Sequence, residues 1–332
     1  MTTTRSFPTS RPRRLRQHEF LRHLVAETRL SPHDLIAPLF VCENSEKQLN
    51  IPGMPGVQRI PLKQLAARAA TIQKLGIPAI ALFPVIPQQF KSKYSSEAHN
   101  PKGLIPRAIE IIKKKTPDLG VITDIALDPY SSDGQDGITN AAGTIINDAT
   151  LDALCRQALC LAAAGSDIVA PSDMMDGRVG AIRAALDSNG YTDLPILAYT
   201  AKYASSLYDP FRSAIGSAKN LGKSNKLTYQ MFPANSQEAL YEAALDLQEG
   251  ADMIMVKPGN MYADIIWRLH QECNAPVFAY QVSGEFSMLS HLGGTDPSQR
   301  ASVILESLVS LKRAGASAIL TYFAEEAAAL LK

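Results

Sequence analysis

The strongest constraint on the fold of this chain is a regular alternation between short apolar runs and longer segments with helical periodicity. Counting from Ala79, we expect eight strands, at Ala79–Phe83, Val121–Leu127, Asp167–Ala170, Leu194–Tyr199, Leu227–Met231, Asp252–Val256, Val277–Val282 and Ala318–Tyr322. Helices that alternate with buried strands build a parallel sheet with right-handed crossovers. Eight strands within 332 residues predict an α/β protein with a closed (β/α)8 TIM barrel.

The segments between these runs complete the pattern. Helices are predicted at Lys63–Leu75, Ile105–Lys115, Thr150–Ala164, Asp176–Ser188, Ser236–Glu249, Met261–Cys273, Pro297–Arg313 and Ala324–Leu331. A further strand, Ile36–Val41, precedes the eight. The alternative is an open doubly wound sheet, but no GxGxxG follows the first strand, which disfavours a dinucleotide-binding form of it.

Composition narrows the range of partners and locations. The hydrophobic content of 46% supports a large core, and the net charge of +1 provides no field that would recruit nucleic acid or a membrane. No apolar run approaches the length of a membrane span, and no secretory signal is recognisable. Four scattered cysteines, Cys42, Cys155, Cys160 and Cys273, are typical of reduced thiols. We therefore expect a cytoplasmic protein.

Residues 1–34 differ in composition from the remainder of the chain. They contain Arg5, Arg11, Arg13, Arg14, Arg16, Arg22 and Arg29. Such a segment can bury little apolar surface by itself. We interpret it as an extended N-terminal arm whose guanidinium groups meet carboxylates of another subunit, although a disordered basic tail agrees equally well with the composition. Residues 35–332 then form a single catalytic barrel domain.

Two lysines stand at predicted strand ends. Lys257 follows the buried run Ala251–Val256 and precedes Pro258-Gly259, and Lys202 follows the run that ends at Tyr199. Because the carboxyl ends of barrel strands converge on one face, we expect strands four and six to bring the two amines together across the mouth. A lone lysine at this place would more simply extend its ammonium into water.

Two lysines in one dry cavity predict imine chemistry. Burial and mutual repulsion favour the loss of a proton from one ammonium group. The neutral amine attacks a ketone, and the resulting imine eases loss of a proton from the adjacent carbon. One such lysine would suggest an aldolase. Two suggest two carbonyl substrates, or one imine lysine and one lysine that transfers protons.

Residues around these lysines suggest how a substrate is held. The segment Ser205–Lys226 replaces an expected helix and carries Arg212, Lys219, Lys223 and Lys226, which suits a mobile cationic lid for a carboxylate. Ser283 and Tyr322 follow strands seven and eight and offer hydroxyl donors for a second carboxylate. Each of these features also occurs as an ordinary surface loop or a satisfied hydroxyl.

The acidic stretch Asp124–Asp136 reads TDIALDPYSSDGQD from Thr123. Its carboxylates Asp128 and Asp136 are separated by a turn rich in serine and glycine. They could assist proton transfer or hold a hard cation, and ordinary turn aspartates are the simpler interpretation.

Several strings in order along the chain resemble the porphobilinogen synthase (5-aminolevulinate dehydratase) family over almost its whole length. They are RPRRLR at Arg11, FPV at Phe83, SDMMDGRV at Ser172, YTAKYAS around Lys202, YDPFRSA around Arg212, MVKPG around Lys257 and YQVSGEF around Ser283. Each string is weak alone, but their combination is specific.

The resemblance implies a condensation of two 5-aminolevulinate molecules per site into porphobilinogen, with loss of two waters, in heme biosynthesis. Lys257 resembles the lysine that forms an imine with the substrate of the propionate side, and Lys202 resembles the lysine that holds the second substrate. Arg212 and Lys226 match the residues that bind the second carboxylate, and Ser283 and Tyr322 match those that bind the first. Residues expected to support the site are Asp128, Asp136, Ser172, Asp173, Tyr208, Phe211 and Tyr280.

The resemblance also concerns metal use and assembly. Zinc-dependent relatives carry three cysteines where this chain has Ala126, Asp128 and Asp136, so no active-site zinc is expected. Glu242 matches the ligand of an allosteric Mg²⁺ in a magnesium-responsive subgroup. Asp133 departs from the histidine that the resemblance implies there, which puts in doubt any proton-transfer role at that position. Family members are homo-octamers with smaller forms, whose arms wrap neighbouring subunits.

Two other functions remain to be weighed. A class I aldolase or another Schiff-base lyase would use one imine lysine and often a phosphate site after strands seven and eight. A scaffold bound through its basic arm would need neither lysine, and it gives no reason for two amines at converging strand ends.

Overall fold

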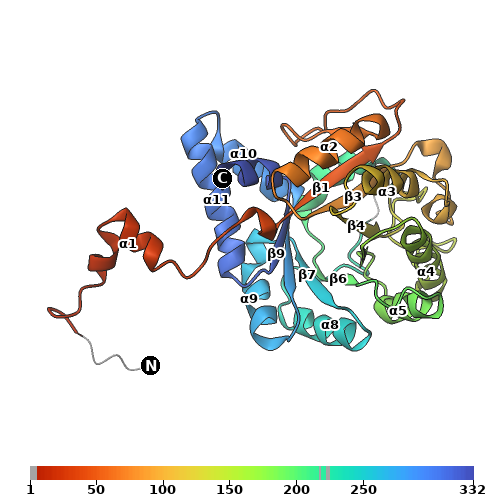
Figure 1. Cartoon of the computed structure of the whole chain (residues 1–332). Helices are drawn as coiled ribbons and strands as arrows, with labels where there is room; N and C mark the ends of the chain where they lie inside the picture. The colour runs from red at the N-terminus through yellow and green to blue at the C-terminus, as the bar shows by residue number, and fades with distance from the viewer. Residues whose placement is uncertain (1–5, 217, 222–224) are drawn as a thin grey trace.

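The computed structural model describes residues 6–216, 218–221 and 225–332. Parallel strands form a continuous sheet in the order β5-β4-β3-β1-β9-β8-β7-β6, and a parallel bridge between Val169 and Ile196 joins its two ends. The strands are β1 Leu35–Cys42, β3 Ala79–Val85, β4 Gly120–Ile125, β5 Ile168–Pro171, β6 Leu197–Lys202, β7 Met253–Lys257, β8 Val277–Gln281 and β9 Ala318–Thr321. The predicted (β/α)8 barrel is therefore confirmed (Figure 1).

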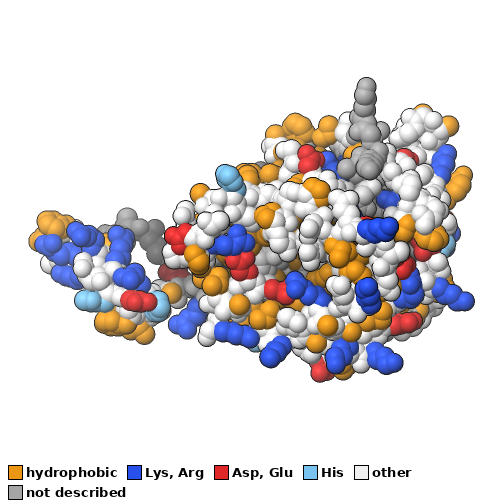
Figure 2. Space-filling view, turned by 90° about the horizontal axis from the view of Figure 1, so that it is seen from above, with side chains coloured by type: hydrophobic (Ala, Val, Ile, Leu, Met, Phe, Trp, Pro, Cys, Tyr) orange, Lys and Arg blue, Asp and Glu red, His pale blue; other side chains and the backbone are white. Residues whose placement is uncertain are grey.

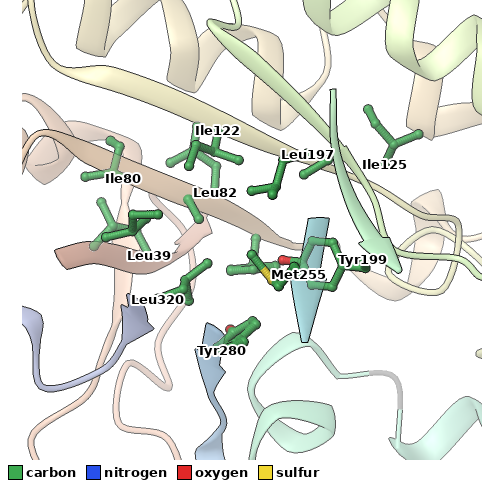
Figure 3. Packing of buried hydrophobic residues seen from close by; sticks show 14 of the residues in the cluster. Leu39, Ile80, Leu82, Ile122, Ile125, Leu197, Tyr199, Met255, Tyr280 and Leu320 are labelled. Carbon is green, nitrogen blue, oxygen red and sulfur yellow. The ribbon is translucent and has the colours of Figure 1, made fainter. Parts of the chain in front are cut away.

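Apolar side chains from strands distant in sequence fill the barrel. Figure 3 shows Leu39 of β1, Leu82 of β3, Leu197 of β6 and Met255 of β7 gathered in one cluster. Each of them is at most 4% exposed. Burial of one such side chain stabilises the fold by roughly 1.5–3 kcal/mol, which is why strands that are apolar on both faces assemble into a ring.

Helices cover the outside of the ring. They are α2 Leu62–Lys74, α3 Leu104–Lys115, α4 Asn147–Ala163, α5 Arg178–Ser188, α8 Gln237–Gln248, α9 Ala263–Glu272, α10 Ser283–Gly293, α11 Pro297–Arg313 and α12 Ala324–Leu330. In α3, Ile105, Ile109 and Ile112 form the buried face, and the basic residues 113–115 lie in the last turn, where the helix dipole favours positive charge. None of the described helices is long and apolar enough to cross a membrane.

One predicted strand is wrong. Leu227–Met231 forms turns, Leu227 is 56% exposed, and only Met231 makes a bridge, to Tyr203. The eighth strand of the ring is instead β1, which lies between β3 and β9, and β6 pairs directly with β7. Apolar character over five residues does not distinguish a ladder strand from a turn, whereas β1 has a partner on each side. The short strand β2 Arg59–Pro61 also pairs with β1.

The segment predicted as a lid in place of a helix contains helices. Ser205–Lys226 includes α6 Asp209–Ile215 and α7 Ala218–Leu221, and a further helix, α10, follows β8. Pro210 lies in the first turn of α6, and Gly216 ends the helix with φ 72°. Proline and glycine therefore mark the beginning and the end of this helix and do not prevent its formation. Lys223 of the predicted lid lies outside the described residues.

The N-terminal arm lies away from the barrel (Figures 1 and 2). Its helix α1 Glu19–Leu24 has no buried residue. Phe7, Phe20 and Leu24 are 60–75% exposed, between basic side chains. Phe7 contacts Arg11 and Phe20 stacks on His18, both within the arm, and none of the three packs against the core of the barrel. The arm is therefore suited to contact another surface.

Candidate active site

Lys202 and Lys257 lie side by side at the carboxyl end of the barrel. β6 and β7 pair in parallel, with Lys202 opposite Lys257 in the register. Since no strand lies between them, the lysines end neighbouring strands, not alternate ones as expected from the sequence. Both side chains are buried, at 5% and 6% exposure. Both lysines line a cavity of about 20 Å³, which Tyr208 and Phe211 also line. This volume holds about one water molecule.

Aromatic rings enclose the amine of Lys257. Its Nζ lies 4.4 Å from the ring centroid of Tyr280, 4.9 Å from that of Phe211, and 5.2 and 5.3 Å from those of Tyr199 and Tyr208. Burial, and then the charge of Lys202, lower the pKa of Lys257 to about 7, against the opposing effect of nearby aspartates. Near neutral pH a large fraction of this amine is therefore uncharged and nucleophilic.

Lys202 occupies polar surroundings. Its Nζ donates a hydrogen bond to the backbone carbonyl of Ser172 and lies 3.7 Å from Asp136 Oδ1. The carbonyl and carboxylate hold this amine at the end of β6. The prediction that Ser172 contributes to the site agrees with its place in the cavity wall.

The two aspartates of the acidic stretch hold a lysine from the lid segment. Lys226 Nζ donates to Asp136 Oδ2 at 2.8 Å and to Asp128 Oδ2 at 3.2 Å. Burial alone would lower the pKa of Lys226, but the two carboxylates outweigh it and raise that pKa. Although burial opposes it, Lys202 and Lys226 together lower the pKa of Asp136 to about 2.

This arrangement bears on metal binding at the acidic stretch. The ammonium group of Lys226 lies between the two carboxylates that replace the zinc cysteines of the predicted relatives. In the described part of the chain, no group of three or more His, Cys, Asp or Glu residues could hold a metal ion. The donors present at Asp128 and Asp136 do not fit a thiolate zinc site.

Asp124 is a site residue that the sequence reasoning did not select. It is the last residue but one of β4, is half-buried and lines the same cavity as both lysines. Burial raises its pKa to about 6, while the side chain of Ser172, Lys202 and Lys257 act in the opposite direction. Its Oδ1 has no hydrogen-bond partner in the described chain. The signal available in the sequence was its place as the first carboxylate of the acidic stretch, near the end of a predicted strand.

The predicted carboxylate-binding hydroxyls are already hydrogen-bonded. Ser283 Oγ accepts from the backbone N–H of Phe211 at 3.0 Å and donates to the carbonyl of Leu207 at 3.3 Å. Tyr322 Oη lies 2.8 Å from Tyr280 Oη. Both hydroxyls therefore connect to the aromatic enclosure of Lys257.

Other predicted residues are distributed unequally. Tyr208, Phe211 and Arg212 line the cavity between the lysines, and Arg212 also pairs with Asp209 at 3.1 Å. Asp173 lies outside that cavity wall: it is buried 3.9 Å from Arg178 and accepts the N–H of Met175. Burial raises its pKa to about 7. The structure therefore supports a role for Asp173 in shaping the loop after β5, not in contacting a substrate.

Glu242 lies in a separate cavity. This cavity of about 440 Å³ is also lined by Asp176 and Glu238. Burial raises the pKa of Glu242 to about 6, although Arg178 opposes this. The site is acidic and contains none of the lysines described above.

Comparisons with known proteins agree with this geometry. The sequence model of the family described as "Delta-aminolevulinic acid dehydratase" matches residues 9–330. The chain is 50% identical to the chloroplastic delta-aminolevulinic acid dehydratase of Oryza sativa subsp. japonica, over 97% of this chain and 75% of that protein. It is also 50% identical to the delta-aminolevulinic acid dehydratase of Bradyrhizobium diazoefficiens, over 97% of this chain and 91% of that protein.

A solved structure extends the similarity to three dimensions. The delta-aminolevulinic acid dehydratase (porphobilinogen synthase) of Toxoplasma gondii ME49, in complex with the reaction product porphobilinogen, superposes with a TM-score of 0.93 and 47% sequence identity, covering 96% of this chain and 91% of that one. With the match to the family model over nearly the whole chain, this shows that the protein belongs to the delta-aminolevulinic acid dehydratase family.

Proposed function

We propose that this protein is a lyase that condenses two molecules of 5-aminolevulinate into porphobilinogen, with loss of two waters, as a step of heme biosynthesis. The observation that carries the proposal is the pairing of Lys202 with Lys257 in the β6–β7 register. The amine of Lys257 is shielded from water by aromatic rings, whereas that of Lys202 lies among polar groups. Two different amines in one site suit an asymmetric condensation of two identical ketones.

Lys257 acts first as nucleophile in this proposal. Its uncharged amine attacks the ketone carbon of one substrate, and the carbinolamine loses water to give an imine. The imine accepts electron density when the adjacent carbon loses a proton. Asp124, with an unpartnered carboxylate oxygen in the same cavity, is a candidate to take such a proton.

Lys202 holds the second substrate through its own imine. Arg212 and Lys226 would bind the carboxylate of that substrate, and Ser283 and Tyr322 would bind the carboxylate of the first. Because Lys226, Ser283 and Tyr322 each have a protein partner at present, substrate binding has to exchange these partners for a carboxylate. Charge-assisted bonds to a carboxylate can offset that exchange.

Trapping with borohydride tests the proposal. We expect reduction in the presence of 5-aminolevulinate to leave an adduct on Lys257, detected by peptide mass spectrometry. Loss of the adduct from both Lys257 and Lys202 would contradict the imine mechanism. A colour assay for the pyrrole product, run beside an assay for aldol cleavage, separates this activity from that of a class I aldolase.

We further propose that Mg²⁺ binds near Glu242 as an allosteric activator. Glu242 offers one carboxylate to the cavity that Asp176 and Glu238 also line, and water molecules would complete the shell of the ion, since Mg²⁺ in proteins is often bound by only one or two carboxylates. The bound ion would supply positive charge on α8, remote from the lysines. A Mg²⁺-dependent rise in melting temperature that Glu242→Gln abolishes would support this site, and an unchanged melting temperature would oppose it.

For assembly, we propose a homo-octamer with smaller forms in exchange, in which the arm contacts a neighbouring subunit. The exposed apolar and basic residues of the arm support this contact. Native mass spectrometry of the full chain and of a chain lacking residues 1–34 tests it, because loss of the arm should reduce the assembly size. We propose a cytoplasmic location on the basis of the free cysteines.

A further inference from the structure

The last turn of α6 is held by two cations from an early part of the chain. Arg59 Nε donates to the carbonyl of Ala214 at 2.9 Å, and its Nη2 donates to that of Ser213 at 3.1 Å. Lys91 Nζ donates to the carbonyl of Gly216 at 3.3 Å. Carbonyls at the end of a helix lack partners within it and carry the negative end of the helix dipole. A cation there both donates hydrogen bonds to these carbonyls and compensates the dipole.

Arg59 is itself fixed to the barrel. Its backbone lies in β2, in register with Phe40 of β1, and its N–H donates to the carbonyl of Leu49 at 2.8 Å. Its Nη1 donates to the carbonyl of Gln48 at 3.0 Å and lies 3.9 Å from Glu46. The side chain is only 10% exposed. The rigid, planar guanidinium therefore connects α6 to the barrel in one defined geometry.

The held helix forms the roof over Lys257. Phe211 of α6 places its ring 4.9 Å from Lys257 Nζ, and its N–H is bound by Ser283. Tyr208, immediately before α6, adds a second ring and donates to the carbonyl of Lys257 at 3.0 Å. The cavity of about 20 Å³ below this roof is too small for a five-carbon amino acid. Displacement of α6, which carries Phe211, would enlarge this space beside the amine.

We propose that Arg59 is the latch of the active-site roof: its bonds to the end of α6 hold Phe211 against Lys257, and their release admits the substrate. The identity of the substrate rests on the proposed function, whereas the contacts of Arg59 with α6 do not depend on it. Arg59 is a positioning residue, since it acts on Lys257 only through α6. A latch of two or three hydrogen bonds is strong enough to keep the roof closed and weak enough to open in each turnover.

The electrostatic surroundings allow this role to be isolated. The titratable groups that face Lys257 are the phenols of Tyr199, Tyr208 and Tyr280, the amine of Lys202, and the carboxylates of Asp124, Asp128 and Asp136. Arg59 is not among the main charges that act on the pKa of Lys257, which are Lys202, Asp124, Asp128 and Asp136. The acidic group that pairs with Arg59 is Glu46, 3.9 Å away. Removing the Arg59 charge should therefore affect Lys257 through hydration alone.

The test measures the hydration of Lys257 without substrate. Arg59→Ala, Arg59→Lys and wild type are labelled by reductive methylation across pH 5.5–10, and the extent of labelling at Lys257 is read by peptide mass spectrometry. Arg183→Ala is the matched control, because Arg183 also donates to two carbonyls, of Leu194 and Tyr191, at the opposite end of β6.

We expect the labelling midpoint of Lys257 to lie near pH 7 in wild type and Arg183→Ala. In Arg59→Ala it should rise by about one unit, because water reaches the amine. The midpoint in Arg59→Lys should lie between these values, since an ammonium group keeps the positive charge but cannot bind both carbonyls in the planar geometry of a guanidinium group. The KM for 5-aminolevulinate should rise about tenfold in Arg59→Ala, with a smaller change in kcat.

The same midpoint in Arg59→Ala and Arg183→Ala would overturn the latch. If Arg59→Ala does not fold, the comparison of Arg59→Lys with wild type decides, and an unchanged midpoint again contradicts the proposal. Absence of a 5-aminolevulinate adduct in wild type would instead refute the proposed function, while the labelling midpoints still report on the latch. The two failures are therefore distinguishable.

Discussion

Lys202 and Lys257 are partners in the β6–β7 register, yet their amines lie in opposite surroundings. Lys202 Nζ is 3.7 Å from the carboxylate of Asp136, whereas Lys257 Nζ is 4.4 Å from the ring centroid of Tyr280. One strand position and one side-chain type thus provide two amines of different character. An enzyme that joins two identical molecules asymmetrically needs such a difference, and here it comes from the neighbours of each lysine.

Lys257→Met should abolish condensation. Methionine fills a similar volume but cannot form an imine, so kcat/KM is expected to fall by at least about three orders of magnitude. Steady-state production of the pyrrole measures the effect. Lys114→Met, at an exposed position on α3, is the control and should keep wild-type activity. Residual activity of Lys257→Met above a tenth of wild type would contradict the role of Lys257.

The same substitution should stabilise the fold near neutral pH. The pKa of Lys257 is about 7 in the folded protein and about 10.4 in an unfolded chain, so between these values the unfolded state binds more protons and stability rises with pH. Lys257→Met removes this penalty, which is of the order of a few kcal/mol at pH 7. Its gain in melting temperature should be larger at pH 7 than at pH 9.5, and a gain independent of pH would be inconsistent with a buried neutral amine.

Phe211→Ala should shift the acid limb of the pH–rate profile upward. Activity requires the uncharged amine, so the rate of wild type rises as pH increases through about 7. Removal of the ring lets water solvate the ammonium form, which raises the pKa of Lys257 by about one unit. Phe211→Leu keeps an apolar roof and serves as the control with a smaller shift. Identical limbs in both variants would show that this ring does not dehydrate the amine.

Asp136→Asn should destabilise the protein strongly. Asp136 contacts both Lys202 and Lys226, and loss of its charge leaves a buried cation poorly compensated. Removal of one partner of a buried ion pair costs about 3–5 kcal/mol in the free energy of unfolding, measured in urea. Asp187→Asn breaks a half-exposed pair with Arg183 and should cost less than about 1 kcal/mol. Equal costs would mean that the buried cluster contributes no more than a surface pair.

Metal removal should separate zinc from magnesium. Because Lys226 lies between Asp128 and Asp136, we expect a zinc-selective chelator to leave activity unchanged. Added Mg²⁺ should raise activity severalfold in wild type and not in Glu242→Gln. Loss of activity after zinc removal alone would contradict this interpretation of the acidic stretch.

Much of the architecture follows from local sequence. The apolar residues of α3 recur with a helical period, and β3, β4 and β7 are short apolar runs, so the sequence predicts which segments are helices or strands and in which order they follow. The sequence also shows that Lys257 follows an apolar run and that the arm is rich in arginine. The contact of the arm with another subunit stays a prediction.

Tertiary structure decided the relationships that span the ring. Only closure of the barrel shows that β1, between β3 and β9, is one of the eight strands, and that β6 pairs directly with β7 because Leu227–Met231 forms no strand between them. Lys202 and Lys257 are therefore direct neighbours. The partners of Lys226, the place of Asp124 and the bonds from Arg59 to α6 join segments far apart in sequence. Local propensity determines the elements, whereas burial and electrostatics at the mouth depend on which elements meet. The lysines could therefore be selected from the sequence, but the difference between their environments required the folded barrel.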